Sequence, residues 1–240
     1  MKGMTVLRAF DEAHSQLSLA EIARLTDIER AAARRLVLTL VHLGYVRKND
    51  NRYSLTPRVL VLGSGFLRGN HFGRRVQPLL ELCARELGYS VSLAMRDGAS
   101  AVYVAQSSQQ NARYTFGFTV GSRLPLLSTS IGRVLLAWGD EDWAREMIET
   151  GPIERFTPDT ITDRDRIAAQ VQEIRTRGVS IVAGEFEAGA VGISVPLGAV
   201  GTAEAALGFS EPMGDIAPDS YARLTEILHR HAGEIAAALR

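Results

Sequence analysis

Two helix-forming segments joined only by "TDI" constrain the fold of this chain more than any other feature. The first, Ser18–Leu25, places Ser18 and Glu21 at the spacing of a capping box, in which two residues satisfy backbone N–H groups at a helix start. The second is expected over Glu29–Leu43 and ends before Gly44, a residue type that readily adopts the left-handed conformation of a helix end. Helices joined by so short a turn cross at a steep angle, so the sequence predicts a helix-turn-helix.

The segments around these helices complete a small domain and lead out of it. Asp27 suits the turn because a short polar side chain bonds locally and accepts unusual backbone angles. A further helix is expected over Met4–Ala13, and strand-forming residues on either side of "NDN" predict a hairpin, the wing. Pro57 favours the first turn of a helix after the wing. The predicted divisions are a winged helix-turn-helix DNA-binding domain over 1–56, a linker helix over 57–71 and a second domain over 72–240.

Charge is distributed unevenly along the chain. The formal net charge is zero, but residues 1–65 hold ten Lys or Arg against six Asp or Glu, and the remainder holds 17 against 21. The first segment therefore carries a balance of +4 and the remainder a balance of −4. Such asymmetry indicates that the first segment meets an anion and the second does not.

The helix expected over Glu29–Leu43 has an apolar face and a basic N-terminal half. Leu36, Leu40 and Leu43 recur at spacings of four and three residues, with Ala33 and Val37 beside them, so one face is expected to pack inward. The arginines of the first two turns point away from this face. They occupy the positions at which a recognition helix presents side chains to the major groove. Arginine binds guanine or phosphate through two hydrogen bonds. The candidate DNA-binding residues are Arg30, Ala31, Arg34 and Arg35 on this helix, Ser18 at the preceding cap, and Arg47, Lys48 and Arg52 on the wing.

The second predicted domain mixes strand and helix patterns without strict alternation. Strand-forming stretches are "SVSLAMRD", "AVYVAQ", "ARYTFGFTV", "SIVAGEF", "GISVPLG" and "AEAALGFS". Helical stretches are "FGRRVQPLLELCARELG", "STSIGRVLLAW", "DEDWAREMIET", "TDRDRIAAQVQEIRTRG" and "DSYARLTEILHRHAGEIAAAL". Clustered strands of this kind favour an α+β fold with a mainly antiparallel sheet flanked by helices.

The stretch "LSLAEIARLTDIERAAARRLVLTLVHLGYVRKNDNRYSLTPRVLVLG" resembles the winged helix-turn-helix of the IclR family of bacterial transcriptional regulators. It is most similar to the subgroup that controls catabolism of aromatic acids such as protocatechuate and 4-hydroxybenzoate. The likeness continues in "VGSRLPLLSTSIGRVLLAW" and "IRTRGVSIVAGEFEAGAVGISVPL". The resemblance implies a DNA-binding homodimer, often a dimer of dimers, whose second domain has a GAF-like fold and binds a small organic acid. It also implies a palindromic double-stranded operator, because twofold-related recognition helices read half-sites about 34 Å apart.

The stretch "PLLSTSIGRVLLAW" runs from a loop into a helix, whose free N–H groups and dipole suit a bound carboxylate. A serine or threonine at this place also suits a helix cap without any ligand. In the family this helix start forms part of the effector pocket, and the resemblance implies effector-binding residues at Ser128, Thr129, Ser130, Ile131 and Gly132. The opposite wall is expected to come from Glu185, Glu187, Val191, Ile193, Ser194 and Ser210.

Several positions of this wall depart from the family pattern. Relatives commonly have an acidic residue where Ala183 stands, an arginine and a small polar residue at Val191 and Gly192, and in several members a histidine at Leu127. These differences remove a partner for an acidic effector, leave a smaller and more apolar wall, and disfavour a bound metal. We therefore expect an organic acid with its anionic head at the helix start and an apolar body towards Val191 and Ile193. A domain that has lost effector binding is the alternative.

Other classes of function find little support in the sequence. The single cysteine, Cys83, excludes an intramolecular disulfide and a cysteine zinc cluster, and the five histidines show no metal spacing. Neither GxGxxG nor GxSxG occurs, so we expect no cofactor and no enzyme activity. The absence of a membrane span and of a signal peptide favours the cytoplasm. A basic helix that docks an acidic protein partner is the remaining alternative to DNA binding.

Overall fold

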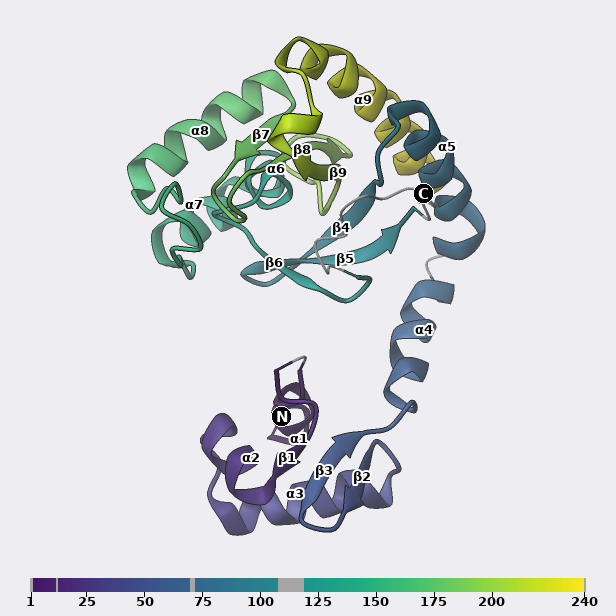
Figure 1. The fold of residues 1–240 in the computed structure, drawn as a ribbon, viewed down its shortest axis with the longest axis vertical. Helices are drawn as coiled ribbons and strands as arrows, with labels where there is room; N and C mark the ends of the chain where they lie inside the picture. Colours follow the sequence, from purple (N-terminus) through teal and green to yellow (C-terminus); the bar gives the residue numbers. More distant parts are fainter. Residues whose placement is uncertain (1, 12, 70–71, 108–118, 240) are drawn as a thin grey trace. The chain divides into compact units, whose positions relative to one another are not determined.

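The computed structural model describes residues 2–11, 13–69, 72–107 and 119–239, and the chain forms two compact units, Met1–Gly69 and Asn70–Arg240. Figure 1 shows the elements of each unit coloured along the sequence. Most of the predicted strand "ARYTFGFTV" lies outside the described residues.

The first unit has the predicted winged helix-turn-helix architecture. Its helices are α1 (Lys2–Arg8), α2 (Leu19–Thr26), α3 (Arg30–His42) and α4 (Val59–Gly69). Its strands β1 (Leu17–Ser18), β2 (Val46–Asn49) and β3 (Arg52–Leu55) pair antiparallel in the order β1-β3-β2. Strands β2 and β3 form the predicted wing hairpin, which turns at Asp50 with a φ of 51°.

Local hydrogen bonds fix the ends of α2 and α3. The Glu21 N–H donates to the Ser18 hydroxyl at 3.3 Å, and the Ser18 N–H donates to the Glu21 carboxylate at 2.7 Å, so the predicted capping box is confirmed. Asp27 lies in the left-handed region with a φ of 51°, and Gly44 does so with a φ of 78°. These residues end their helices where the sequence predicted.

Two other boundaries in this unit differ from the prediction. The opening helix stops at Arg8, because the Asp11 carboxylate accepts a hydrogen bond from the His14 N–H at 2.8 Å and closes a local turn instead. The last helix, α4, begins at Val59, with Pro57 in the turn that precedes it. Short polar side chains and tight turns shift helix ends by a few residues in this way.

The apolar face of α3 includes three of the five residues predicted to face inward. Ala33, Val37 and Leu40 are buried, and they pack with α1 and α2 in the core of the unit. By contrast, Leu36 is half-buried, and Leu43 is 47% exposed at the end of the helix.

The second unit is built on one antiparallel sheet, which confirms the predicted α+β class. Its strands are β4 (Ser92–Asp97), β5 (Ser100–Gln106), β6 (Arg123–Pro125), β7 (Ser180–Ala183), β8 (Ala190–Leu197) and β9 (Ala205–Pro212), in the order β6-β5-β4-β9-β8-β7. Its helices are η1 (Phe72–Val76, a π-helical turn), α5 (Gln77–Leu87), α6 (Ser130–Trp138), α7 (Glu141–Thr150), α8 (Arg164–Arg177) and α9 (Tyr221–Ala238), with 3-10 turns η2 (Met213–Asp215) and η3 (Pro218–Ser220). The short strand β6 was not predicted.

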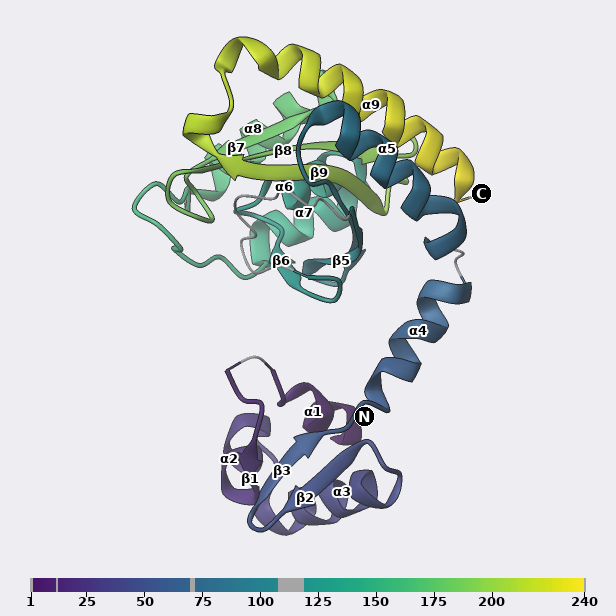
Figure 2. The same cartoon turned by 45° about the vertical axis from the view of Figure 1, so that its right-hand side comes forward.

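Helices cover both faces of this sheet. The pair α5 and α9 lie side by side over one face, as both views show (Figure 1 and Figure 2). Helix α6 packs on the other face against β8 and β9, and α7 and α8 pack against α6. The apolar residues of α6 thus form the centre of a core between the sheet and the outer helices.

Strand β8 divides its side chains between these two faces by simple alternation. The Ser194 hydroxyl lies 2.7 Å from the Ser130 hydroxyl of α6, and a Cβ added to Gly192 would lie 2.6 Å from that same Ser130 oxygen. Residues 192 and 194 therefore face α6, whereas Val191 and Ile193 are fully buried against the opposite face. This corrects the expectation that Val191 and Ile193 face a ligand at the α6 start.

Candidate nucleic-acid interface and small-molecule pocket

The start of α3 is a basic surface that a carboxylate caps. The Glu29 carboxylate accepts hydrogen bonds from the N–H groups of Ala31 and Ala32, at 3.0 and 3.2 Å. The arginines of the first two turns are exposed, and no carboxylate of the described residues forms an ion pair with them. These are Arg30, Arg34 and Arg35. A rigid helix start with unpaired guanidinium groups is suited to phosphate and base contacts.

The basic residues of the wing differ in how firmly they are held. Lys48 is exposed on β2. On the same strand, the Arg47 Nε donates to the Ser54 hydroxyl at 2.9 Å. Arg52 on β3 donates to the Gln16 carbonyl at 3.0 Å, which ties the wing to the segment before α2. Arg52 therefore has a structural role that the sequence did not indicate.

Ser18 lies at the start of α2, where its hydroxyl and N–H are both used in the capping box. Hydrogen bonds from the Ser18 N–H and hydroxyl lower the pKa of Glu21, which is also 3.7 Å from Arg52. The structure thus places Ser18 at the cap of α2, where its N–H and its hydroxyl are both engaged with Glu21.

A pocket opens at the start of α6, and it brings together most of the predicted effector-binding residues. Its open space, mouth included, is about 530 Å³. Ser128, Thr129, Ser130 and Ile131 line one side, and Glu187 and Ser210 line the other. Tyr103, Leu124 and Phe186 add apolar and aromatic surface that the sequence analysis did not include.

The N-terminal end of α6 offers unpaired hydrogen-bond donors to this pocket. Thr129 is the N-cap: its hydroxyl accepts from the Gly132 N–H at 3.0 Å and donates to the Pro125 carbonyl at 2.7 Å. The N–H groups of Ser130 and Ile131 have no acceptor among the described residues, as expected for the first turn of a helix. The Thr129 cap therefore leaves two N–H donors of this helix start without a protein acceptor among the described residues.

The Ser128 hydroxyl is a further unsatisfied group at the pocket. Ser128 is 1% exposed, and its oxygen has no hydrogen-bond partner among the described residues. A buried polar atom without a partner costs about 1–3 kcal/mol, so such an atom calls for a ligand or an ordered water.

Four predicted residues do not line the pocket: Gly132, Val191, Ile193 and Ser194. Gly132 packs against the backbone of Leu126, where an added Cβ would lie 2.4 Å from the Leu126 Cα. Ser194 lies behind the α6 start and is used by the Ser130 hydroxyl, and Val191 faces the other side of the sheet. Gly132 and Ser194 thus shape the helix start from behind.

A buried ion pair forms the wall beside the pocket, and the sequence analysis missed it. The Arg133 guanidinium, 2% exposed, binds both oxygens of the Glu185 carboxylate at 2.6 Å and donates from Nε to the Leu127 carbonyl at 2.9 Å. Glu185 also accepts from the Ile161 N–H at 3.0 Å. The one indication in the sequence was an arginine within the apolar helix "SIGRVLLAW".

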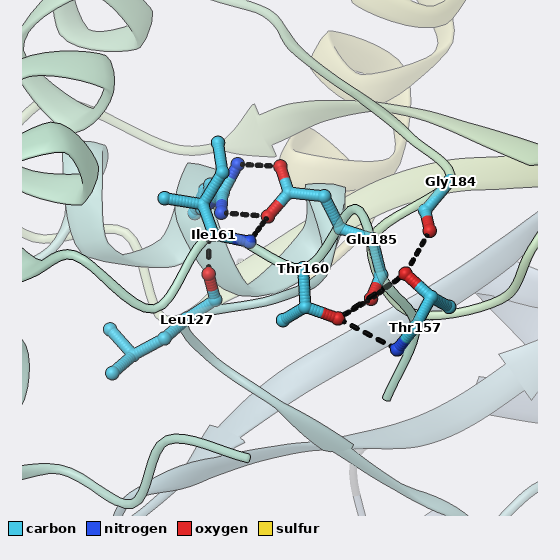
Figure 3. Close-up of polar contacts among 7 residues, drawn as sticks. Leu127, Thr157, Thr160, Ile161, Gly184 and Glu185 are labelled. Carbon is cyan, nitrogen blue, oxygen red and sulfur yellow. Dashed lines mark hydrogen bonds and ion pairs between the residues drawn. The ribbon is translucent and has the colours of Figure 1, made fainter. Parts of the chain in front are cut away.

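Hydrogen bonds from a neighbouring loop fix the backbone around Glu185, as Figure 3 shows. The Thr157 hydroxyl donates to the Gly184 carbonyl at 2.6 Å, and the Thr160 hydroxyl donates to the Glu185 carbonyl at 2.6 Å. Glu185 was expected as a polar candidate for the ligand, but its carboxylate is saturated by protein groups. Its role is to hold the pocket wall in place.

Burial sets the protonation of two other pocket residues. It raises the pKa of the Tyr103 phenol, which is neutral at pH 7 in any case, to about 12. Burial also raises the pKa of Glu187 above its ordinary value, which favours the neutral carboxyl and reduces the negative charge of the pocket wall.

The described residues offer little for metal or thiol chemistry. No group of three or more His, Cys, Asp or Glu in this part of the chain is arranged to hold a metal ion. Cys83 is buried, and burial raises the pKa of its thiol to about 12. None of the helices within the described ranges is long and apolar enough to cross a membrane.

A winged helix-turn-helix with exposed arginines and a second unit with a small-molecule pocket define a class, the two-domain transcriptional regulators. Residues 1–50 match the "IclR helix-turn-helix domain", and residues 66–237 match the "Bacterial transcriptional regulator IclR C-terminal" family. The chain therefore belongs to the IclR family of bacterial transcriptional regulators.

Its relatives include regulators of aromatic-acid catabolism. It is 34% identical to the Pca regulon regulatory protein of Pseudomonas putida over 216 residues, 90% of this chain and 74% of the relative. It is 35% identical to the p-hydroxybenzoate hydroxylase transcriptional activator of Acinetobacter baylyi over 211 residues, 86% of this chain and 78% of the relative. The crystal structure of an IclR homolog complexed with 4-hydroxybenzoate, from Microbacterium hydrocarbonoxydans, superposes with a TM-score of 0.80 at 26% identity and covers 100% of this chain and 98% of that one. The expected resemblance to the aromatic-acid subgroup is confirmed.

Proposed function

We propose that this regulator binds a palindromic operator as a homodimer, and that a small aromatic acid bound at the start of α6 changes its operator affinity. The observation that carries the proposal is the pair of free N–H groups, Ser130 and Ile131, beside the unpartnered Ser128 hydroxyl in an aromatic-walled pocket. These donors converge where the helix dipole favours negative charge. A regulator bound to DNA acts in the cytoplasm and needs no catalytic reaction.

The pocket favours a single-ring acid. The carboxylate accepts hydrogen bonds from the α6 start, and the ring lies against the side that holds Tyr103 and Phe186. The Ser210 hydroxyl and the Glu187 carboxyl are the polar groups available to a ring substituent. This arrangement replaces the expected apolar wall of Val191 and Ile193, and it agrees with the 4-hydroxybenzoate named for the Microbacterium homolog.

The homodimer is supported by apolar surface on α4. Leu60, Val61 and Leu62 are between 53% and 70% exposed on this helix. Large apolar side chains exposed next to one another are typical of protein contacts. A second copy pairing along α4 would place two α3 helices across a twofold axis, with half-sites about 34 Å apart. A dimer of dimers would bind two such operators.

Ligand modulation follows from thermodynamic linkage. A bound acid shifts the operator equilibrium only if it binds one arrangement of the paired α3 helices more tightly than the other. A coupling of 1–3 kcal/mol, about 5- to 150-fold in affinity, is typical of such regulators.

Calorimetry on matched α6 variants tests the ligand site. Ser130→Pro removes the hydroxyl and the N–H, whereas Ser130→Ala removes the hydroxyl alone. Proline fits the first position of a helix, and the extended Thr129 before it, with φ −122° and ψ 152°, accepts a following proline. We expect 4-hydroxybenzoate and benzoate to bind and benzyl alcohol not to bind, with Ser130→Pro losing about 1.5–3 kcal/mol more than Ser130→Ala. Binding of only cations or sugars, or equal losses for the two variants, would contradict the site.

Selection of duplexes from a random pool tests the DNA function. The purified protein should enrich a palindrome, and the binding should weaken steeply with salt because phosphate contacts release counterions. Enrichment of no sequence, with the basic helix binding an acidic protein instead, would contradict it.

A further inference from the structure

The C-terminal end of α3 accepts hydrogen bonds beyond those that cap the helix. The Tyr45 N–H donates to the Leu40 carbonyl at 3.0 Å and the Gly44 N–H donates to the Val41 carbonyl at 2.9 Å, the two bonds of a Schellman motif. These bonds and the left-handed Gly44 complete the end of the helix. The carbonyls of the next residues, Leu43 to Tyr45, remain free to bind another element.

The turn before α4 binds all three of these carbonyls. The Arg58 guanidinium donates from Nη1 to the Leu43 carbonyl at 2.7 Å. The Thr56 hydroxyl donates to the Gly44 carbonyl at 2.5 Å, and the Thr56 N–H donates to the Tyr45 carbonyl at 2.9 Å. A cation at the negative end of the α3 dipole adds favourable electrostatic energy to these bonds.

Arg58 also packs against the residues that it binds. Its guanidinium carbon lies 5.5 Å from the centre of the Tyr45 ring, within the range of a cation–π contact. A Cβ added to Gly44 would lie 2.8 Å from the Arg58 Nη1, so a glycine at this position leaves room for the guanidinium. Because the Arg58 carbonyl accepts from the Val61 N–H at 3.1 Å, its backbone already belongs to the first turn of α4. The side chain therefore reaches from one helix to the end of the other.

We propose that Arg58 is a positioning residue, which fixes the angle between α4 and the recognition helix α3. The chain continues from α4 into the second unit, so α4 is the covalent route by which that unit acts on α3. In a dimer paired along α4, this angle sets the distance between the two α3 helices and hence the accepted half-site spacing. The inference rests on the proposed homodimer. Arg58 differs in this from the exposed arginines of α3, because its guanidinium is bound to the Leu43 carbonyl.

Operators with altered spacing provide the test. The full-length protein, Arg58→Ala, Arg58→Lys and the matched control Arg68→Ala on the same helix are titrated onto the selected palindrome and onto versions with one or two base pairs added or removed between half-sites. Wild type and Arg68→Ala should prefer the selected spacing by about tenfold or more, a loss comparable to that from a mismatched base pair. Arg58→Ala should bind all spacings within about threefold of one another, while it retains its base preference within each half-site. Arg58→Lys should recover part of the discrimination, because lysine donates to the Leu43 carbonyl but lacks the planar guanidinium.

The salt dependence of binding separates this role from a direct DNA contact. Arg58→Ala should leave the slope of log affinity against log salt unchanged, whereas loss of a phosphate contact lowers it by about 0.9. A lowered slope, or wild-type spacing discrimination in Arg58→Ala, would overturn the inference. If wild type itself showed no preference for spacing, the homodimer would be wrong and the inference would fail with it. Because wild type alone reveals a failure of the homodimer, that failure is distinguished from a failure of the role proposed for Arg58.

Discussion

At the residue scale, Glu29 combines two effects at the start of the recognition helix. Its carboxylate caps α3 through two N–H groups, yet it also places a negative charge beside Arg30 and any bound phosphate. The carboxylate is therefore expected to alter operator preference. The cap and the charge can be separated by substitution.

Glu29→Ala should lower the stability of the first unit by about 1 kcal/mol, within a range of 0.5–2 kcal/mol for a lost cap. Glu29→Ser should keep most of the cap and bind operator more tightly, because the charge is gone. Circular dichroism during denaturant unfolding reports both units, whereas fluorescence of the two tryptophans, Trp138 and Trp143, reports only the second. A shift of the fluorescence transition in Glu29→Ala would refute a local capping role.

Arg34→Ala should weaken operator binding by about 1–3 kcal/mol and relax sequence preference at one base position, if its fork reads a base edge. Lys48→Ala on the exposed wing is the control, because a phosphate contact weakens binding equally on all sequences. Fluorescence anisotropy with the selected operator and a scrambled duplex measures both. An equal loss for Arg34→Ala on the two duplexes would assign Arg34 to phosphate.

At the element scale, the Arg133–Glu185 pair joins α6 to the loop after β7. Glu185→Ala should destabilise the second unit by about 3–5 kcal/mol, because it leaves a buried guanidinium without its carboxylate. The double variant Arg133→Met with Glu185→Leu removes both charges and should recover most of that loss. The tryptophan fluorescence transition measures this unit. A double variant as unstable as the single one would show that the charges themselves, and not the unpaired arginine, decide stability.

The carboxyl of Glu211 on β9 provides a test through the pH dependence of stability. Burial, and to a lesser extent the charge of Asp215, raises the pKa of Glu211 above its ordinary 4.5. The folded state therefore holds the proton more tightly, and the stability that this gives is lost as pH rises from about 4.5 through the folded pKa. Glu211→Gln, which never ionises, should gain stability over wild type at about pH 7 and little at about pH 4. A difference that is constant with pH would contradict the shift.

Local hydrogen bonding made the elements of the first unit predictable, whereas long-range pairing limited prediction in the second. The capping box of Ser18 and the left-handed Gly44 act within a few residues, so their sequence patterns located helix ends within one residue. The direction of Val191 depends on which face of β8 meets α6, and a run buried on both faces does not reveal this. Similarly, Arg133 and Glu185 are 52 residues apart in the sequence, and only the folded chain shows that they form an ion pair.

At the scale of the whole molecule, the uneven charge and the two-unit fold assign different roles to the two units. The basic first unit presents unpaired arginines, and the second encloses a pocket with free donors. Sequence patterns indicated the α+β class and the family, because helix periodicity and the winged motif are local. The aromatic side of the pocket, with Tyr103 and Phe186, comes from segments far apart in the sequence and emerged only from the fold.

The central claim is that ligand binding at α6 is linked to operator binding at α3. The most direct measurement is the operator affinity of the full-length protein, by anisotropy, with and without saturating 4-hydroxybenzoate. We expect a change of about 5-fold or more, and we expect Ser130→Pro to abolish it while Ser130→Ala keeps it. An operator affinity that does not change, although calorimetry shows the acid bound, would contradict the account.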